Sequence, residues 1–220
     1  MAYREFVSLI HKSTSRDYLA RVNEIDKAEV AEVAIKFDKD YWDGDRLTGY
    51  GGYRYDGRWL TVAHAMVEAY GLKPGMRVLD VGSGKGFLLH DLLTACPGIE
   101  VEGLEYSAYA IQHSMDDIQP QVKLGTAASL PWPDDHFDLV ISINALHNLY
   151  NYELAAALSE IERVSRGAKY LCVEAYRNER EKVNLMYWQL TCRIFHTPKE
   201  WEFDFAQSGY TGDYEFIYFE

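Results

Sequence analysis

Three glycines at two-residue spacing, Gly82, Gly84 and Gly86, follow an apolar run that contains Asp80. A leucine-rich amphipathic run begins directly after them, at Phe87. This order predicts a buried parallel strand, a glycine loop and a helix. Such a loop lets the backbone approach a ligand without interference from Cβ atoms, and the first N–H groups of the helix offer hydrogen-bond donors. We therefore expect a ligand site here, although a loop that only makes a tight turn is the alternative.

A second acidic residue narrows the kind of ligand. Glu105 ends the next apolar run, residues 99–105, which we predict to be a strand. A carboxylate in this place can accept hydrogen bonds from both hydroxyls of a ribose. The G-x-G-x-G spacing is one residue shorter than the motif of dinucleotide sites, which disfavours a nicotinamide-dependent reductase but keeps it as an alternative.

Two stretches, residues 72–86 (LKPGMRVLDVGSGKG) and 125–140 (GTAASLPWPDDHFDLV), resemble motifs of class I S-adenosylmethionine-dependent methyltransferases. The resemblance is to the small-molecule type, close to the ubiquinone and menaquinone enzymes, and covers roughly residues 60 to 176, about half the chain. It implies a Rossmann-like methyltransferase fold and S-adenosylmethionine as the cofactor, with S-adenosylhomocysteine as its product. The implied reaction is methyl transfer to an oxygen, nitrogen or carbon nucleophile of a small polar molecule.

The resemblance also implies how the donor is held. The glycine loop would pass its methionine part, Asp80 would reach the ammonium group, Glu105 would hold the ribose and Tyr106 would lie against the adenine. Thr126 stands where the family commonly has aspartate, so we expect the donor to bind more weakly, by roughly 1 kcal/mol in binding free energy. The implied donor-binding residues are Tyr50, Asp80, Gly82, Ser83, Gly84, Glu105, Tyr106, Thr126, Ala127 and Asn144.

His147 and Glu174 are the candidate catalytic residues. His147 lies in a Leu-His-Asn-Leu stretch that resembles the Leu-His-His-Leu of many relatives. It could take a proton from the acceptor near neutral pH, or it could pack behind the donor or cap the next helix. Glu174 ends a predicted strand, where it could act as a base or orient the acceptor. A base is helpful and not obligatory, because alignment and exclusion of water can supply most of the rate.

Residues 41–59 combine glycines, which oppose regular structure, with aromatic residues, which oppose disorder. The resemblance implies that this segment is a lid over the donor that shapes the acceptor pocket. The alternative is aromatic packing against the first helices. Arg58 or Arg177 could hold an acidic acceptor. The candidate substrate-binding residues are Tyr53, Tyr55, Arg58, Tyr150 and Arg177.

The elements that position these residues alternate between helix and strand patterns. We predict helices near residues 59–70, 107–117, 151–166 and 179–195, and strands near 121–126, 137–144 and 168–175. This alternation predicts an α/β fold with a mostly parallel sheet of six or seven strands, with ligands at the carboxyl ends of the strands. A last strand over 214–219 is expected to be antiparallel, as the family pattern implies. Residues 1–58, with helices over 3–11 and 16–37, are expected to form an N-terminal helical cap and lid, and residues 59–220 the core.

Composition limits the possible partners. The chain has 220 residues and a net charge of −12, which suits one core and opposes binding to nucleic acid. No run approaches the roughly 20 apolar residues that span a bilayer and no secretory leader is visible, so we expect a cytoplasmic protein without membrane insertion. The three cysteines show no metal-binding spacing. We expect a small-molecule acceptor as partner. A free sheet edge would permit a homodimer, or a non-catalytic donor-binding partner subunit as an alternative function.

Overall fold

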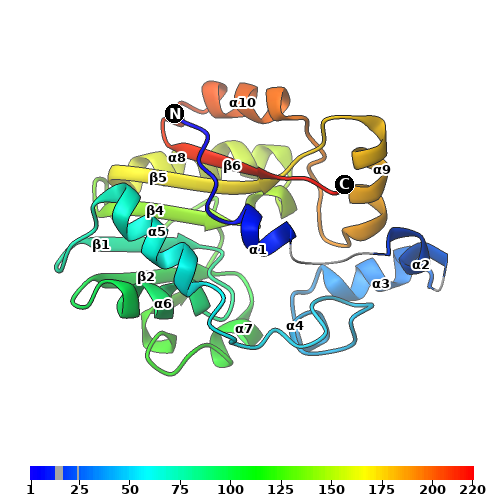
Figure 1. The fold of residues 1–220 in the computed structure, drawn as a ribbon, viewed down its shortest axis with the longest axis horizontal. Helices are drawn as coiled ribbons and strands as arrows, with labels where there is room; N and C mark the ends of the chain where they lie inside the picture. The colour runs from blue at the N-terminus through cyan, green and yellow to red at the C-terminus, as the bar shows by residue number, and fades with distance from the viewer. Residues whose placement is uncertain (13–16, 24) are drawn as a thin grey trace.

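The computed structural model describes residues 1–12, 17–23 and 25–220. In this described part, six strands form one sheet in the order β3-β2-β1-β4-β5-β6 (Figure 1). Every pair of neighbouring strands is parallel. The predicted α/β fold with a mostly parallel sheet is confirmed. The strands are β1 (Arg77–Val81), β2 (Glu100–Glu105), β3 (Val122–Leu124), β4 (Phe137–Ile143), β5 (Ser165–Glu174) and β6 (Asp213–Ile217).

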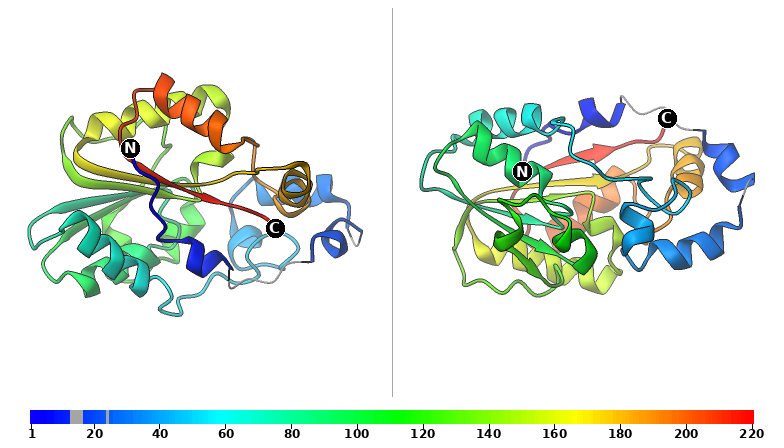
Figure 2. Two further views of the ribbon diagram at one scale, coloured as in Figure 1. Left: turned by 45° about the horizontal axis from the view of Figure 1, so that its top comes forward. Right: turned by 90° about the horizontal axis from the view of Figure 1, so that it is seen from below.

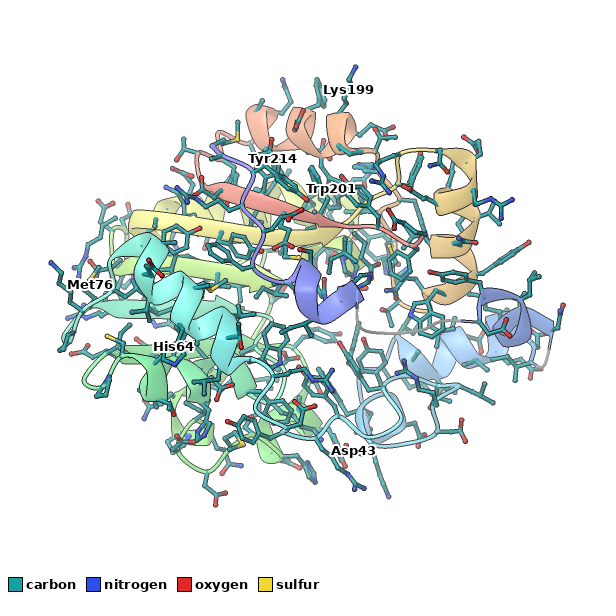
Figure 3. The ribbon with its side chains drawn as sticks, viewed as in Figure 1. Asp43, His64, Met76, Lys199, Trp201 and Tyr214 are labelled. Carbon is teal, nitrogen blue, oxygen red and sulfur yellow. The ribbon has the colours of Figure 1, made fainter. Side chains whose placement is uncertain are left out.

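The direction of the last strand differs from the prediction. β6 is parallel to β5, with Tyr170 opposite Asp213 and Glu174 opposite Ile217, so the expected antiparallel C-terminal strand is wrong. A parallel neighbour requires the chain to cross back over the sheet first. The segment that contains α9 (Glu179–Trp188) and α10 (Pro198–Gln207) makes this return. α10 directs the fully buried Trp201 towards the sheet (Figure 3).

Helices cover both faces of the sheet (Figure 2). One core contains residues of α1 (Ser8–Lys12), α5 (Leu60–Tyr70) and α6 (Phe87–Ala95), and the other contains residues of α8 (Asn151–Val164) and α10. Successive strand residues point to opposite faces, so Val78 of β1 joins the first core and Leu79 the second. Burial on both faces explains why the strands read as continuous apolar runs.

The N-terminal segment is less regular than predicted. Instead of helices over 3–11 and 16–37, the described residues form α1, α2 (Tyr18–Asn23), α3 (Lys27–Ala34) and α4 (Lys39–Trp42), while residues 13–16 and 24 lie outside the description. Asp26 accounts for the start of α3, because its carboxylate accepts hydrogen bonds from the N–H groups of Ala28 and Glu29. The division into a cap of residues 1–58 and a core of 59–220 stays a prediction.

The beginning of the chain lies along β6. Tyr3 forms a parallel bridge with Tyr214. The fully buried carboxylate of Glu215 accepts hydrogen bonds from the N–H groups of Phe6, Val7 and Ser8, at 2.6 to 2.9 Å. This arm covers the edge of β6, which would otherwise expose unpaired backbone groups.

The remaining elements are short. α7 (Ala108–Gln112) ends well before the predicted residue 117, and the 3-10 helices are η1 (Gln119–Gln121) and η2 (Leu146–Asn148). Among the helices of the described residues, none combines the length and apolar character needed to cross a bilayer. Within the same residues, His, Cys, Asp and Glu side chains form no group of three or more that could hold a metal ion.

Candidate active site

The glycine loop leaves the carboxyl end of β1 with positive backbone φ angles of 86° at Gly82 and 56° at Gly84. Side chains rarely adopt this conformation, so both positions favour glycine. The space around the loop also favours glycine at both positions. A Cβ atom at Gly82 would overlap the Cβ of Ala145, and one at Gly84 would lie 3.1 Å from the ring of Trp42. Without Cβ atoms the loop backbone packs closely against Ala145 and Trp42, at the wall of a neighbouring hollow.

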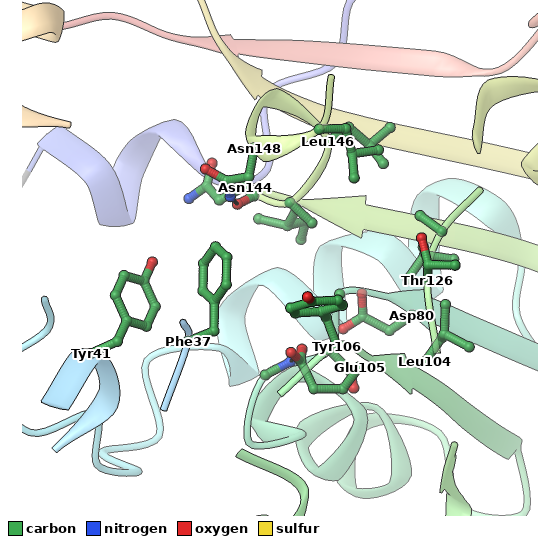
Figure 4. Close-up of a pocket in the computed structure, with 18 of the residues that line it drawn as sticks. Phe37, Tyr41, Asp80, Leu104, Glu105, Tyr106, Thr126, Asn144, Leu146 and Asn148 are labelled. Atoms are coloured by element: carbon green, nitrogen blue, oxygen red, sulfur yellow. Dashed lines mark hydrogen bonds between the residues drawn. The ribbon is translucent and has the colours of Figure 1, made fainter. Parts of the chain in front are cut away.

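That hollow is a cavity of about 290 Å³, which we call the smaller cavity (Figure 4). The ends of β1, β2 and β4 contribute to its wall, together with residues 125–127 and aromatic residues of the N-terminal segment. The structure brings every residue predicted to bind the donor to this one cavity, while their binding role stays a prediction. They are Tyr50, Asp80, Gly82, Ser83, Gly84, Glu105, Tyr106, Thr126, Ala127 and Asn144.

Several polar atoms of this wall are buried without a partner. Among the described residues, none forms a hydrogen bond with Oδ1 of Asp80, Oγ of Ser83 or Oδ1 of Asn144. Burial, and secondly the charge of Glu105, raises the pKa of Asp80 to about 7. A buried, unpartnered carboxylate oxygen is costly, and a cationic group of a ligand would relieve that cost. The wall therefore fits a ligand that carries an ammonium group.

Glu105 is held firmly beside the loop. Its Oε2 accepts a hydrogen bond from the N–H of Gly84 at 2.7 Å, and its Oε1 accepts one from the N–H of Ser107 at 2.8 Å. Burial raises the pKa of Glu105, although these N–H groups act in the opposite direction. A carboxylate offers about four lone-pair sites, so capacity remains for ligand hydroxyls.

Part of the wall of the smaller cavity is exposed to solvent. Tyr106 is 65 % exposed and lies close to Glu105 and Asp80 (Figure 4). The rings of Phe37 and Tyr106 meet edge to face, with 6.1 Å between the ring centroids and 84° between the ring planes. Oγ1 of Thr126 accepts a hydrogen bond from the N–H of Ala128 at 3.3 Å. An exposed ring beside a polar hydroxyl fits a flat heterocycle that stacks and also donates.

Aromatic residues of the N-terminal segment close over the glycine loop. Trp42 stacks on Tyr50, with 5.4 Å between centroids and 9° between ring planes, and Tyr53 stacks on Phe87 of α6. The indole N–H of Trp42 donates to Oγ of Ser107 at 3.0 Å. The segment therefore packs on α4 and on the core at the cavity, and its role as a lid stays a prediction.

An ion pair joins this segment to the glycine loop. Nζ of Lys85, a residue only 5 % exposed, lies 2.7 Å from both carboxylate oxygens of Asp43 and donates to the carbonyl of Tyr53 at 2.9 Å. The hydroxyl of Tyr109 donates to the same carboxylate. Asp43 belongs to the loop after α4 (Figure 3). The pair is partly shielded from water, which strengthens its attraction.

A second hollow of about 790 Å³, the larger cavity, lies next to the smaller one. Buried His147 and Glu174 line it, as do Gln189 and Thr191 from the segment after α9. Aromatic rings form much of its remaining wall. The residues that line both cavities are Tyr41, Tyr50, Tyr53, Trp59, Phe87 and Asn144.

The two candidate catalytic residues meet in the larger cavity. His147 and Glu174 are 2 % and 4 % exposed, and Nε2 of the imidazole lies 3.5 Å from Oε2 of the carboxylate. Burial lowers the pKa of His147 to about 3, so the ring is neutral at physiological pH. No described residue forms a hydrogen bond with its Nδ1. Glu174 accepts a hydrogen bond through Oε1 from the amide of Gln189. The neutral ring can accept a hydrogen bond at its free Nδ1, but a pKa near 3 opposes the uptake of a proton near neutral pH that the sequence led us to expect.

The predicted substrate-binding residues separate into groups. Tyr53 lines both cavities, Arg58 lines the larger one and Tyr150 lines the smaller one. The guanidinium carbon of Arg193 lies 4.3 Å from the ring centroid of Tyr150. Tyr55 and Arg177 line neither cavity. The Tyr55 hydroxyl donates to Asp91 at 2.6 Å, and Arg177 is held by Glu181 and Glu220.

Sequence reasoning missed Trp42, Lys85, Arg46, Arg54 and Gln189. Lys85 had a signal, since it is the one charged residue between the glycines of the loop. The two arginines lie in the aromatic segment, where only Arg58 was singled out. Nothing in the sequence marks Gln189, because its role depends on where the chain returns after α9.

Comparison with known proteins supports this description. A family model for the methyltransferase domain matches residues 72–207. A demethylmenaquinone methyltransferase from Lysinibacillus sphaericus is 32 % identical over 162 residues, which cover 70 % of this chain and 65 % of that enzyme. A ubiquinone/menaquinone biosynthesis C-methyltransferase UbiE from Laribacter hongkongensis is 32 % identical over 161 residues, which cover 70 % and 63 %. The chain thus spans less than two thirds of the length of either relative.

A solved structure shows the same architecture. A chain from the complex between the Haloferax volcanii Trm112 methyltransferase activator and a methyltransferase superposes with a TM-score of 0.53 at 25 % identity, covering 69 % of this chain and 72 % of that one. The predicted Rossmann-like methyltransferase fold is confirmed. Because the family model spans more than half of the residues and the sheet, glycine loop and cavity agree with it, the chain belongs to the methyltransferase domain family.

Proposed function

We propose that this chain transfers a methyl group from S-adenosylmethionine to a nucleophile of a small molecule. One observation carries the proposal: two cavities share a wall at the carboxyl ends of the strands. The smaller has unpartnered buried polar atoms on a glycine loop, and the larger has a neutral histidine beside a carboxylate. Relatives named as methyltransferases support the same reaction.

The smaller cavity is our proposed donor site. The Asp80 carboxylate would take the ammonium group, with Oγ of Ser83 nearby, and Glu105 would accept the ribose hydroxyls on its remaining lone pairs. Tyr106 would stack on the adenine, with Thr126 and Ala127 at the edge of the ring. S-adenosylmethionine supplies a methyl group bound to a positively charged sulfur, which keeps the electron pair of the broken bond and becomes a neutral thioether.

The larger cavity is our proposed acceptor site. Its aromatic wall excludes water and holds the acceptor against Asn144, which lines both cavities. When the nucleophile is an O–H or N–H group, the free Nδ1 of His147 accepts a hydrogen bond from it. This nitrogen takes the proton only once methyl transfer has made that group strongly acidic, because burial opposes the imidazolium form. Glu174 holds the ring through Nε2 and stabilises the imidazolium that forms. Residues 1–58 would serve as the cap and lid over a core of residues 59–220.

Calorimetry with S-adenosylhomocysteine tests the donor site. We expect micromolar binding to the wild type and about 10- to 100-fold weaker binding to Glu105→Ala, since hydrogen bonds to a charged group are lost. Glu100→Ala on the exposed start of the same strand is the matched control and should bind as the wild type does. Gly84→Val should abolish binding. A folded wild type that gives no heat would overturn the proposal.

Mass-resolved methyl transfer tests the reaction. Wild type and His147→Asn are incubated with isotopically labelled donor and cell extract, and labelled products are identified. Label on a small molecule, reduced in the variant, would support the proposal. Donor binding without any transfer would favour the alternative, a non-catalytic donor-binding partner subunit. Quenching by NADH but not by the donor would favour a nicotinamide-dependent reductase. The expected homodimer stays a prediction, which light scattering checks.

A further inference from the structure

Arginine side chains gather at the larger cavity, in a chain with a net charge of −12. Arg46, Arg54 and Arg58 all line it, and all three are exposed, whereas His147 and Glu174 are buried. The cavity therefore has a cationic, solvent-facing side and a buried side with a neutral ring and a carboxylate.

The charges of the wall do not all pair with one another. Arg58 forms an ion pair with Asp56, with contacts of 2.5 to 2.9 Å. Glu174, the other acidic residue of the wall, contacts His147 and accepts a hydrogen bond from Gln189. Arg54 makes no hydrogen bond or ion pair with a described residue. The lining thus leaves a guanidinium that carries fixed charge and no carboxylate of its own.

The loop that contains Arg46 fixes the orientation of its side chain. Its guanidinium donates to the carbonyls of Gly49 and Tyr50, at 3.3 and 2.9 Å, and lies 5.4 Å from the ring centroid of Trp188. Carbonyls orient a guanidinium without cancelling its charge. A held arginine and an uncommitted one on the same cavity are suited to bind a carboxylate or phosphate.

We propose that the methyl acceptor is a small organic anion whose carboxylate or phosphate is bound by Arg54 and Arg46, at the opposite end from its nucleophile. This inference rests on the proposed function. Glu174 repels a negative group on the buried side, so the anion turns to the arginines and the nucleophile turns to the neutral His147. The rings of Trp59, Phe87 and Trp188 suit an apolar, planar body between the two ends.

The anionic group of the acceptor binds to the protein, and a different atom of the acceptor receives the methyl group. Methylation of the carboxylate or phosphate itself would remove a charge that the arginines bind, whereas methylation elsewhere leaves that charge in the product. The product of the proposed reaction therefore remains anionic. This feature can be measured without knowing the identity of the acceptor.

Anion-exchange chromatography of labelled products provides the test. Wild type is incubated with labelled S-adenosylmethionine and cell extract, and we expect the main labelled small molecule to be retained at neutral pH. Loss of retention after phosphatase treatment would identify a phosphate, and unchanged retention a carboxylate. A neutral or cationic main product would overturn the inference and leave the proposed function intact.

Substitutions that remove the charge of Arg54 then test whether this residue binds the anionic group of the acceptor. With the purified acceptor, Arg54→Gln should raise KM about 10-fold, Arg54→Lys should recover part of the loss, and kcat should change little. Arg180→Gln, an exposed arginine of α9 outside both cavities, is the matched control. An unchanged KM in Arg54→Gln would overturn the role of Arg54. The affinity for S-adenosylhomocysteine should be unchanged in every variant. A wild type that does not bind S-adenosylhomocysteine would refute the proposed function itself.

Discussion

Nε2 of His147 lies 3.5 Å from Oε2 of Glu174, although the two residues come from different elements, η2 after β4 and the end of β5. The backbone holds this relationship in place, because the carbonyl of His147 accepts hydrogen bonds from the N–H groups of Arg193 and Ile194. The returning segment after α9 therefore holds the backbone of His147, while Glu174 contacts its ring.

We expect His147→Asn and Glu174→Gln each to lower kcat, His147→Asn by about 100- to 10,000-fold if proton transfer is part of the reaction. The double variant should be no worse than His147→Asn, because Glu174 acts through the histidine. Steady-state kinetics on all four proteins measures this coupling. Independent, multiplicative losses would contradict the pairing, and donor affinity serves as the control that must not change.

Donor affinity should depend on pH through Asp80. Because its pKa is raised to about 7, the carboxylate is mostly protonated at pH 6 and mostly ionised at pH 7.5. The ammonium group of the donor binds the ionised form, so affinity for S-adenosylhomocysteine should rise about 5- to 10-fold over this interval. Calorimetry at several pH values measures it, with Asp80→Asn as the comparison that should show no such rise. Equal wild-type affinity at both pH values would exclude this role.

The same aspartate should lower stability at high pH. Its folded pKa is raised above the unfolded value of 3.8, so its favourable contribution is fully present below about pH 4 and is lost progressively as pH rises through 7. In urea denaturation at pH 8, the unfolding free energy of Asp80→Asn should therefore exceed that of the wild type by up to about 4 kcal/mol. The gain at pH 5 should be smaller. Asp116→Asn, on the surface, is the control. A gain independent of pH would point to a cause other than ionisation.

Removing one charge of the Lys85 and Asp43 ion pair should loosen residues 43–58, which belong to the proposed lid. In Asp43→Asn the lysine keeps its charge in a site where its side chain is only 6 % exposed, and we expect a loss of about 1 to 3 kcal/mol in unfolding free energy. Hydrogen exchange of residues 43–58 should become faster, and donor affinity should fall. Asp40→Asn in the exposed start of α4 is the control. The lid interpretation also predicts that donor protects residues 50–58 from protease; equal cleavage with and without donor would count against it.

The N-terminal arm should depend on Glu215. This buried carboxylate accepts three backbone hydrogen bonds from the arm and one from the hydroxyl of Tyr170. Glu215→Ala should lower the unfolding free energy by about 3 to 5 kcal/mol and expose residues 2–8 to hydrogen exchange, because the N–H groups lose their acceptor. Tyr170→Phe removes only one of these bonds and should cost less. Urea denaturation of both variants measures the difference, and equal losses would contradict the account.

Local sequence patterns were sufficient to predict which residues of the glycine loop and of the neighbouring strand ends line the smaller cavity. The glycine loop, Asp80 and Glu105 each lie at the end of an apolar strand, and the strands are parallel, so their carboxyl ends meet at one edge of the sheet. Helix starts were harder to predict. The cap formed by Asp26 divides what periodicity alone suggested was one helix.

The sequence by itself determined the class of fold, the glycine loop and the acids beside it, because these depend on periodicity, backbone freedom and the order of strands along the chain. Only the tertiary structure decided the direction of β6, the meeting of His147 with Glu174 and the gathering of Arg46 and Arg54 at one cavity. These features depend on where the chain returns after α9 and on how residues 41–59 pack, through contacts between residues far apart in sequence. No local pattern specifies such contacts, since each depends on the packing of all the elements between them.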